Sequence, residues 1–272
     1  MLETPLRVIA IGAHPDDCEG KFSGTAAKMA RAGHAVKFLS VTNGDAGHHQ
    51  QGGFELVTRR EAEAQESARR LGIAAYEILD HHDGELVPTV EARRQIIRAI
   101  RQWSADMVVT HRPGDYHPDH RYTSLLVQDA AFMVLVPNVV PDVPALRSNP
   151  VFLYYADEFQ QPVPFRPDVA VAIDDTWDDK VDSLDAHVSQ FYEWLPWLAG
   201  TLAEVPQDPA ARRQWLAPAV ARFGRITPAV RTALEKRYGV DRARQIHYAE
   251  SFELCEYGRR PNPADLDAMF PK

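Results

Sequence analysis

The feature that most constrains the fold is an alternation of short apolar runs with helical patterns in the first half of the chain. Each run is nearly continuous in apolar residues, as expected of a strand buried on both faces of a sheet. Strands that alternate with helices predict a Rossmann-like α/β fold, with a mostly parallel sheet and helices on both faces. The expected strands are residues 6–12, 34–42, 74–79 and 106–111, and the expected helices are residues 22–32, 58–71, 90–103 and 118–134.

Local end signals set the boundaries of two of these helices. Thr58 and Glu61 have the spacing of a capping box, so we expect a helix to begin there. Gly72 follows that helix and Gly33 follows the preceding one, and glycine is the residue typical of a helix C-terminus.

The chain changes character after Pro137. Seven prolines fall between Pro137 and Pro167. This stretch is too apolar for a free linker, so we expect one domain over residues 1–272, with a core at 1–136 and a C-terminal extension at 137–272. The extension is expected to contain strands at 151–155 and 168–173, an edge strand at 246–254, and helices near 178–195, 209–223 and 227–238.

Charge and cysteine content narrow the class of protein. The net charge of −8 repels phosphate backbones and anionic lipid, so nucleic acid and membrane surfaces are disfavoured as partners. The two cysteines, Cys18 and Cys255, are far apart in sequence, which suits a reducing compartment and argues against a cysteine-based zinc cluster. The first apolar run is too short for a signal peptide, and no stretch approaches about 20 apolar residues. We expect a cytoplasmic protein. The sequence leaves open whether it forms a homo-oligomer.

Two four-residue segments carry the chemistry. They are residues 14–17 (HPDD), the first tetrad, and residues 117–120 (HPDH), the second tetrad. Each follows an expected strand at its carboxyl end, the edge at which open α/β sheets bind ligands. One such tetrad is typical of a turn with a helix N-cap. Two of them, both rich in metal-ligating side chains, indicate a metal site.

The tetrads supply the residues of a catalytic metal centre. Two histidines and one carboxylate are a familiar zinc ligand set that leaves a fourth position for water. His14, Asp17 and His120 would make that set, for zinc, iron(II) or another divalent transition metal. Asp16 is then left beside the metal's water, where a carboxylate can act as general base.

The second tetrad leaves two further residues for catalysis. His117, steered by Asp119, could stabilise an oxyanion or protonate a leaving amine. A nucleotide-binding module is the alternative from another class of protein. The Gly-x-Gly-x-x-Gly motif is absent after the first strand, where residues 12–15 (GAHP) stand, so the phosphate cradle is missing.

The two tetrads resemble those of the LmbE-like, or PIG-L, deacetylases, which are zinc enzymes that act on N-acetylglucosaminyl compounds. The resemblance implies for the tetrads the same ligands, general base and acid as above. It adds Arg60 and Asp83 as substrate-binding residues, which fall where some members hold sugar hydroxyls. The weaker matches are residues 42–47 (TNGDAG), Arg60 with Glu63, residues 71–72 (LG), 83–84 (DG), 111–113 (HRP) and 249–252 (AESF).

The chain departs from the family pattern at two places. Members commonly have Glu directly after the first tetrad, whereas here Cys18 intervenes before Glu19. Some members place a tyrosine two residues before the second tetrad, where this chain has Asp115, with Tyr116 one residue later. A tyrosine as oxyanion donor is therefore unsupported.

The resemblance implies hydrolysis of the N-acetyl group of a GlcNAc-type amino sugar by a zinc-bound water, with Asp16 as base. The alternative is an amidase of the same family that removes a larger N-acyl group from a sugar or thiol conjugate. The remaining candidates have no assigned role. Two histidine pairs are expected to be solvated, and one further histidine lies in a helix motif. For an aromatic cluster, core packing is favoured over a subunit interface or a sugar-stacking wall. These candidates are His48, His49, His81, His82, His187, Phe191, Tyr192, Trp194 and Trp197.

Overall fold

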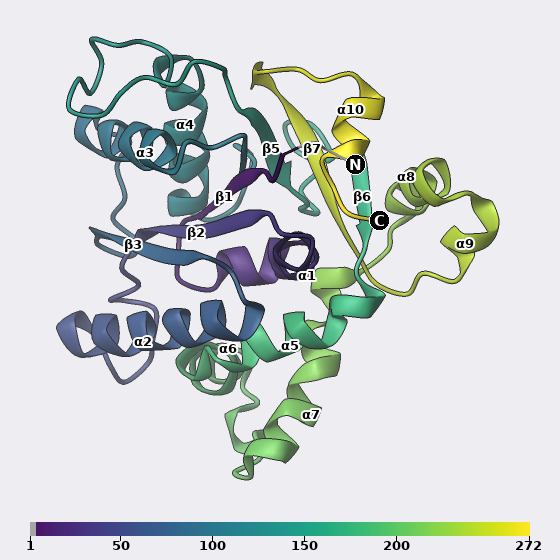
Figure 1. The fold of residues 1–272 in the computed structure, drawn as a ribbon. Helices are drawn as coiled ribbons and strands as arrows, with labels where there is room; N and C mark the ends of the chain where they lie inside the picture. The colour runs from purple at the N-terminus through teal and green to yellow at the C-terminus, as the bar shows by residue number, and fades with distance from the viewer. Residues whose placement is uncertain (1–3) are drawn as a thin grey trace.

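The computed structural model describes residues 4–272, which form one seven-stranded sheet flanked by ten α-helices (Figure 1). Among these residues, no helix is long and apolar enough to cross a bilayer. The strands are β1 (Arg7–Gly12), β2 (Ala35–Thr42), β3 (Ala75–His81), β4 (Met107–Thr110), β5 (Val151–Tyr155), β6 (Val169–Ala172) and β7 (Ala249–Gly258). The helices are α1 (Asp17–Arg31), α2 (Gly53–Leu71), α3 (Val90–Trp103), α4 (Pro118–Met133), α5 (Trp177–Asp185), α6 (Leu195–Ala199), α7 (Pro209–Val220), α8 (Pro228–Tyr238), α9 (Val240–Arg244) and α10 (Pro263–Ala268).

The sheet confirms the Rossmann-like prediction. Its order is β3-β2-β1-β4-β5-β7-β6, and the five strands from β3 to β5 are parallel. The chain passes from β1 outward to β2 and β3, then returns to place β4 on the other side of β1. This reversal makes a topological switch point between β1 and β4, where open α/β sheets bind ligands.

Helices cover both faces of the sheet, as predicted (Figure 1). On one face α1 packs against α2 and α5, and Phe22 and Met29 of α1 lie in the same fully buried cluster as Phe38 of β2. On the other face α3 and α4 bury Ile96 and Leu126 against the strands. Both faces of the central strands are apolar, which is why β1 and β4 are nearly continuous apolar runs.

Two helices begin earlier than predicted. Helix α1 begins at Asp17, inside the first tetrad, where its first-turn carboxylates complement the helix dipole. Helix α2 begins at Gly53, so the capping box expected at Thr58 is wrong. The Thr58 hydroxyl instead donates to the carbonyl of Phe54 at 2.9 Å, one turn earlier in the same helix.

The C-terminal extension corrects two further expectations. The last strand, β7, is not at the edge: it lies between β5 and β6 and is antiparallel to both, and β6 forms the edge. The first residues of β7 are buried because they have a strand on each side. The single helix expected near 178–195 is also wrong, since α5 ends at Asp185 and a π-helical segment, Ser189–Trp194, leads into α6.

Candidate metal centre and active site

Both tetrads lie at the carboxyl ends of neighbouring strands. The first follows β1 and the second follows β4 after a short loop, and β1 pairs with β4 in parallel register. In the second tetrad His117 precedes α4 and Pro118 occupies its first position, where a missing N–H costs nothing. The strand order therefore brings together two segments about one hundred residues apart in sequence.

The turn of the first tetrad is strained at Asp16. The backbone φ of Asp16 is 141°, a value that residues with a side chain rarely adopt. Asp17 closes the turn, because its Oδ2 accepts hydrogen bonds from the N–H groups of Ala13 (3.0 Å) and His14 (2.8 Å). The two carboxylates consequently face different partners: Asp16 Oδ2 lies 3.6 Å from Arg60, and Asp17 faces the histidines.

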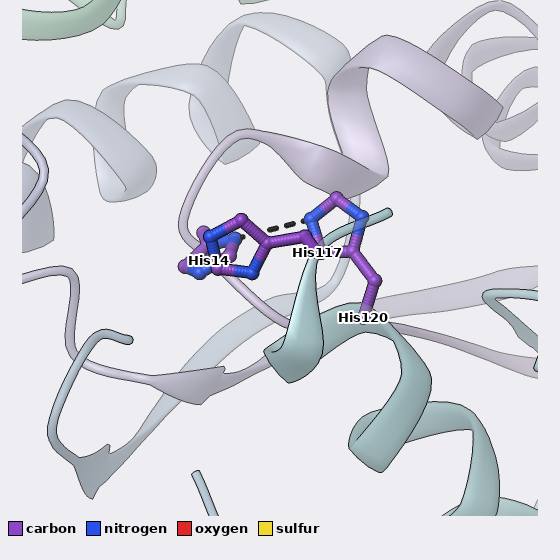
Figure 2. Close-up of side chains that lie close together, drawn as sticks. All are labelled: His14, His117 and His120. Carbon is purple, nitrogen blue, oxygen red and sulfur yellow. Dashed lines mark hydrogen bonds between the residues drawn. The ribbon is translucent and has the colours of Figure 1, made fainter. Parts of the chain in front are cut away.

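The structure brings His14, Asp17 and His120 into one triangle of ligand atoms. His14 Nδ1 lies 3.3 Å from His120 Nε2 (Figure 2), 3.4 Å separates His14 Nδ1 from Asp17 Oδ2, and 3.4 Å separates His120 Nε2 from Asp17 Oδ1. A tetrahedral ion with bonds of about 2.0–2.2 Å needs ligand atoms about 3.3–3.6 Å apart. The two distances to Asp17 involve different oxygens of its carboxylate. With one ligand atom from each residue, the groups within residues 4–272 that could hold a metal ion are His14, His117 and His120; Asp17, His111 and His120; and His14, Asp83 and Asp119.

Each histidine of the triangle has a carboxylate at its other ring nitrogen. His14 Nε2 lies 3.0 Å from Asp83 Oδ1 and 3.2 Å from Asp119 Oδ2, and His120 Nδ1 lies 3.1 Å from Asp115 Oδ2. A carboxylate in this position orients a metal-ligating histidine and makes it a stronger ligand. Such supporting carboxylates are a second feature of the cluster that suits a metal ion.

The placement of Asp119 corrects the expectation that its carboxylate steers His117. The Asp119 side chain is fully buried and accepts hydrogen bonds from the N–H groups of Gly84 (2.7 Å) and Leu86 (3.2 Å), besides its contact with His14. Only the backbone of Asp119 meets His117, where its N–H donates to Nδ1 at 3.3 Å. This arises because His117 is the N-cap of α4 and so turns its Nδ1 to the helix backbone.

His111 belongs to the cluster, although the sequence indicated it only through the weak family match at residues 111–113. Its Nε2 lies 3.2 Å from Asp17 Oδ2, and its ring stacks on that of His120 with centroids 4.1 Å apart. The N–H of Ala13, which donates to Asp17 Oδ2, also lies 3.1 Å from the same Nε2, and His111 joins Asp17 and His120 in a group that could hold a metal ion. The available signal was its position directly after β4, at the sheet edge that carries the site.

Burial and charge set the protonation of the cluster. Burial raises the pKa of Asp16 to about 6, against the opposing charge of Arg60. Burial also acts on Asp17, but the neighbouring His120 and His111 hold its pKa well below the usual range. Burial opposes protonation of His14, yet hydrogen bonds to its carboxylate neighbours raise its pKa. Two adjacent carboxylates thus have opposite tendencies, as expected of a base beside a ligand.

Arg60 and Asp83, predicted to bind substrate, lie beside the triangle but face protein groups. Arg60 is only 2% exposed, and its guanidinium donates to the carbonyls of Pro15 (2.9 Å) and Gly44 (3.1 Å). A Cβ at Gly44, whose φ is 72°, would lie 2.5 Å from Arg60 Nη1, so the loop after β2 closes over the guanidinium. Asp83 lies against both His14 and Arg60. Arg60 therefore holds the backbone of the first tetrad and of the loop after β2 in place.

The other histidines of interest lie beside protein partners. Within residues 4–272, none of them joins a group that could hold a metal ion. The partners are Glu193 for His48 (3.0 Å), Trp197 for His49 (ring centroids 5.1 Å apart), Gln95 for His81 (2.6 Å), Asp45 for His82 (2.6 Å) and Glu19 for His187 (2.9 Å).

The aromatic cluster of the extension divides into two parts. Phe191 and Tyr192 are buried, as core packing requires. Trp197 is 48% exposed and stacks on Trp194 with centroids 5.4 Å apart, so core packing does not describe this part of the cluster.

Fold and site together define an α/β enzyme with a histidine–aspartate centre at the switch point of its sheet. Comparison with known proteins gives the family. The chain matches the PIG-L family, described as GlcNAc-PI de-N-acetylase, over residues 9–131. It is 31% identical to the diacetylchitobiose deacetylase of Thermococcus kodakarensis over 207 residues, which cover 71% of this chain and 74% of the relative. The chain belongs to the PIG-L family and is a deacetylase, a hydrolase of amide bonds.

Solved structures agree on the fold. The N,N'-diacetylchitobiose deacetylase from Pyrococcus horikoshii, in complex with the inhibitor MPG, superposes with a TM-score of 0.69 at 25% identity, over 94% of this chain and 87% of that one. The 4-carboxy-2-hydroxymuconate hydratase from Pseudomonas putida has the same TM-score at 19% identity, over 94% and 96% of the two chains. At that identity the hydratase shares the fold alone, so activity must be argued from the site.

Proposed function

We propose that this protein is a zinc-dependent hydrolase that removes the N-acetyl group from a GlcNAc-type amino sugar. The observation that carries the proposal is the cluster of His14, Asp17 and His120, in which nitrogen and carboxylate atoms of each pair lie 3.3 to 3.4 Å apart. The substrate class is supported by the relatives, which are diacetylchitobiose deacetylases. A bound zinc ion would polarise the acyl carbonyl and acidify the attacking water.

Asp16 is proposed as the general base. It is next to the ligand Asp17 in the chain but is not one of the proposed ligands; its Oδ2 lies 3.6 Å from Arg60, and burial raises the pKa of its carboxyl to about 6. At neutral pH such a group is mostly ionised and is a stronger base than an exposed carboxylate. Its carboxylate would accept the proton of the attacking water and later pass it toward the leaving nitrogen.

His117 is proposed as the residue that stabilises the acyl oxygen. Its Nδ1 accepts the N–H of Asp119, so in the neutral ring the proton lies on Nε2. Burial and the nearby His14 lower the pKa of His117, which favours this neutral form. The Nε2–H can therefore donate a hydrogen bond to the acyl oxygen as negative charge develops there.

Asp119, Asp83 and Arg60 are proposed to position the centre. Asp119 and Asp83 both meet His14 Nε2, which fixes the ring with Nδ1 toward the triangle. Arg60 holds the Pro15 carbonyl and so the backbone of the first tetrad. Asp83 is the member of this group through which a substrate hydroxyl would contact the site.

We propose further that residues 1–272 act as one domain, with the extension at 137–272 completing the core at 1–136. Three buried contacts support this. Lys180 donates to the carbonyl of Glu19 in α1, His187 lies 2.9 Å from the Glu19 carboxylate, and Glu250 accepts hydrogen bonds from two N–H groups of α1. A small-molecule partner, without nucleic acid or membrane, is supported by the acidic net charge of −8, and a cytoplasmic location by the two distant cysteines, which suit a reducing compartment.

Metal content is the first test. We expect about one zinc ion per chain, removal by a chelator with loss of turnover, and recovery of both on adding zinc. His120→Ala should lose the ion because it removes a donor, whereas the exposed His247→Ala, whose histidine pairs with Asp174, should keep it. Elemental analysis of the dialysed proteins measures this. Full turnover by a preparation free of metal would contradict the proposal.

Substrate choice is the second test. N-acetylglucosamine and diacetylchitobiose should release acetate and primary amine in equal amounts, because hydrolysis of one amide yields one of each. Assays of both products across N-acyl sugars of increasing chain length measure this. Release of amine only from longer N-acyl substrates would favour the amidase alternative.

A further inference from the structure

Two aromatic side chains stand beside the candidate metal centre. Tyr116 is 73% exposed, and its ring centroid lies 5.8 Å from that of His117 and 6.1 Å from that of His120. Phe159, from the loop after β5, lies 6.1 Å from Tyr116. We call Tyr116 and Phe159 the aromatic wall. Ligand sites are typically lined by aromatic side chains with a few polar groups, and here both kinds lie together.

The backbone under both rings is braced by arginines. Arg121 Nη1 donates to the carbonyl of Tyr116 at 2.8 Å. The N–H of Phe159 donates to Asp157 Oδ1 at 3.1 Å, and Arg112 Nη1 donates to the same oxygen at 2.8 Å. A rigid support reduces the entropy lost when an exposed side chain is immobilised by a ligand. The backbone of the aromatic wall is thus held in place, while the ring of Tyr116 is exposed to solvent beside the candidate metal centre.

We infer that the aromatic wall binds the pyranose ring of the substrate by stacking on its apolar C–H face. The inference rests on the proposed function, because it places the acetamide of the same sugar at the triangle. His14 of the first tetrad and Asp83 provide polar groups at the centre, and the aromatic wall comes from the residue before the second tetrad and from the loop after β5. A sugar has a polar rim and apolar faces, so it needs both kinds of surface.

If Tyr116 binds the sugar by stacking, substitutions of this residue should have different effects than if it binds through its hydroxyl. Stacking uses the ring face, so Tyr116→Phe should keep KM near the wild-type value, whereas Tyr116→Ala should raise KM for N-acetylglucosamine about tenfold with little change in kcat. Phe159→Ala should raise KM in the same direction, and the Tyr116→Ala, Phe159→Ala double variant should be less than additive because the rings form one surface. Phe132→Ala is the matched control: it is 67% exposed on the last turn of α4 and should change nothing.

A binding measurement separates this inference from the proposed function. Saturation-transfer NMR of glucosamine on the zinc-loaded protein should show transfer to the pyranose C–H protons in the wild type and in Tyr116→Phe, and its loss in Tyr116→Ala. Turnover of amino sugars with unchanged KM and unchanged transfer in Tyr116→Ala would overturn the wall and leave the proposed function standing. A fall in Tyr116→Phe equal to that in Tyr116→Ala would overturn stacking in favour of the hydroxyl. If the wild type hydrolyses no amino sugar, the proposed function fails, and the NMR result alone decides the wall.

Discussion

Asp16→Asn is expected to keep its metal ion and to lose turnover by about 10²–10⁴-fold, the usual worth of general-base assistance. Asparagine has nearly the same shape and tolerates unusual backbone angles, so the strained turn at φ 141° should persist. The amide cannot accept the proton of the attacking water. Measuring kcat at saturating zinc, together with bound zinc per chain, tests both halves of the expectation.

Asp17→Asn is the matched variant at the next residue. It keeps an oxygen that can accept the N–H groups of Ala13 and His14, but it removes the negative charge from the triangle. Zinc affinity and turnover should fall together, and added zinc should restore part of the turnover. If Asp16→Asn lost the ion while Asp17→Asn kept it, the two roles would be reversed. Near-normal turnover of Asp16→Asn would place the base elsewhere.

Lys180→Met is expected to destabilise the protein by about 3–5 kcal/mol, the typical effect of removing one partner of a buried ion pair. Lys180 and Glu250 are both buried, and Nζ donates to Glu250 Oε1 at 2.7 Å and to the carbonyls of Glu19 and Gly20 at 2.9 Å. Methionine would leave the Glu250 carboxylate without its countercharge. The midpoint of urea unfolding measures the loss.

Arg31→Met is the control for that variant, because Arg31 also joins α1 to α5. It pairs with Asp179 at 2.7 Å on the surface, where an ion pair is worth about 0–1 kcal/mol. Adding Glu250→Gln to Lys180→Met should recover part of the lost stability, since it removes the unpaired charge. Equal unfolding midpoints for Lys180→Met and Arg31→Met would contradict the buried-pair account.

The sequence predicts the parallel core because its signals are local. The β1 and β4 runs are apolar along their whole length, and Rossmann-type alternation leaves few alternatives for their order. The misplaced strand depends on distant partners instead. The interior position of β7 follows from its pairing with β5 and β6, which are distant in sequence, so no local pattern shows it.

The candidate site shows the same division. That the two tetrads would meet follows from strand ends, which the sequence indicates. How Asp119 and His111 are oriented does not follow, because each orientation is decided by contacts across the fold. Asp119 turns to the N–H of Gly84, and His111 accepts the N–H of Ala13. Sequence spacing can gather such residues at one edge, but it cannot say which atom meets which.

The interior position of β7 has a consequence for the order in which the protein can be completed. Within residues 4–272, β6 pairs only with β7, and Lys180 finds its carboxylate partner on the same strand. During synthesis, both must wait until the ribosome has released a strand made much later. The N–H groups of Gly24 and Thr25 in α1 also donate to the Glu250 carboxylate only from that stage on. The nascent chain therefore carries both tetrads long before the helix that begins in the first of them has its carboxylate partner on β7.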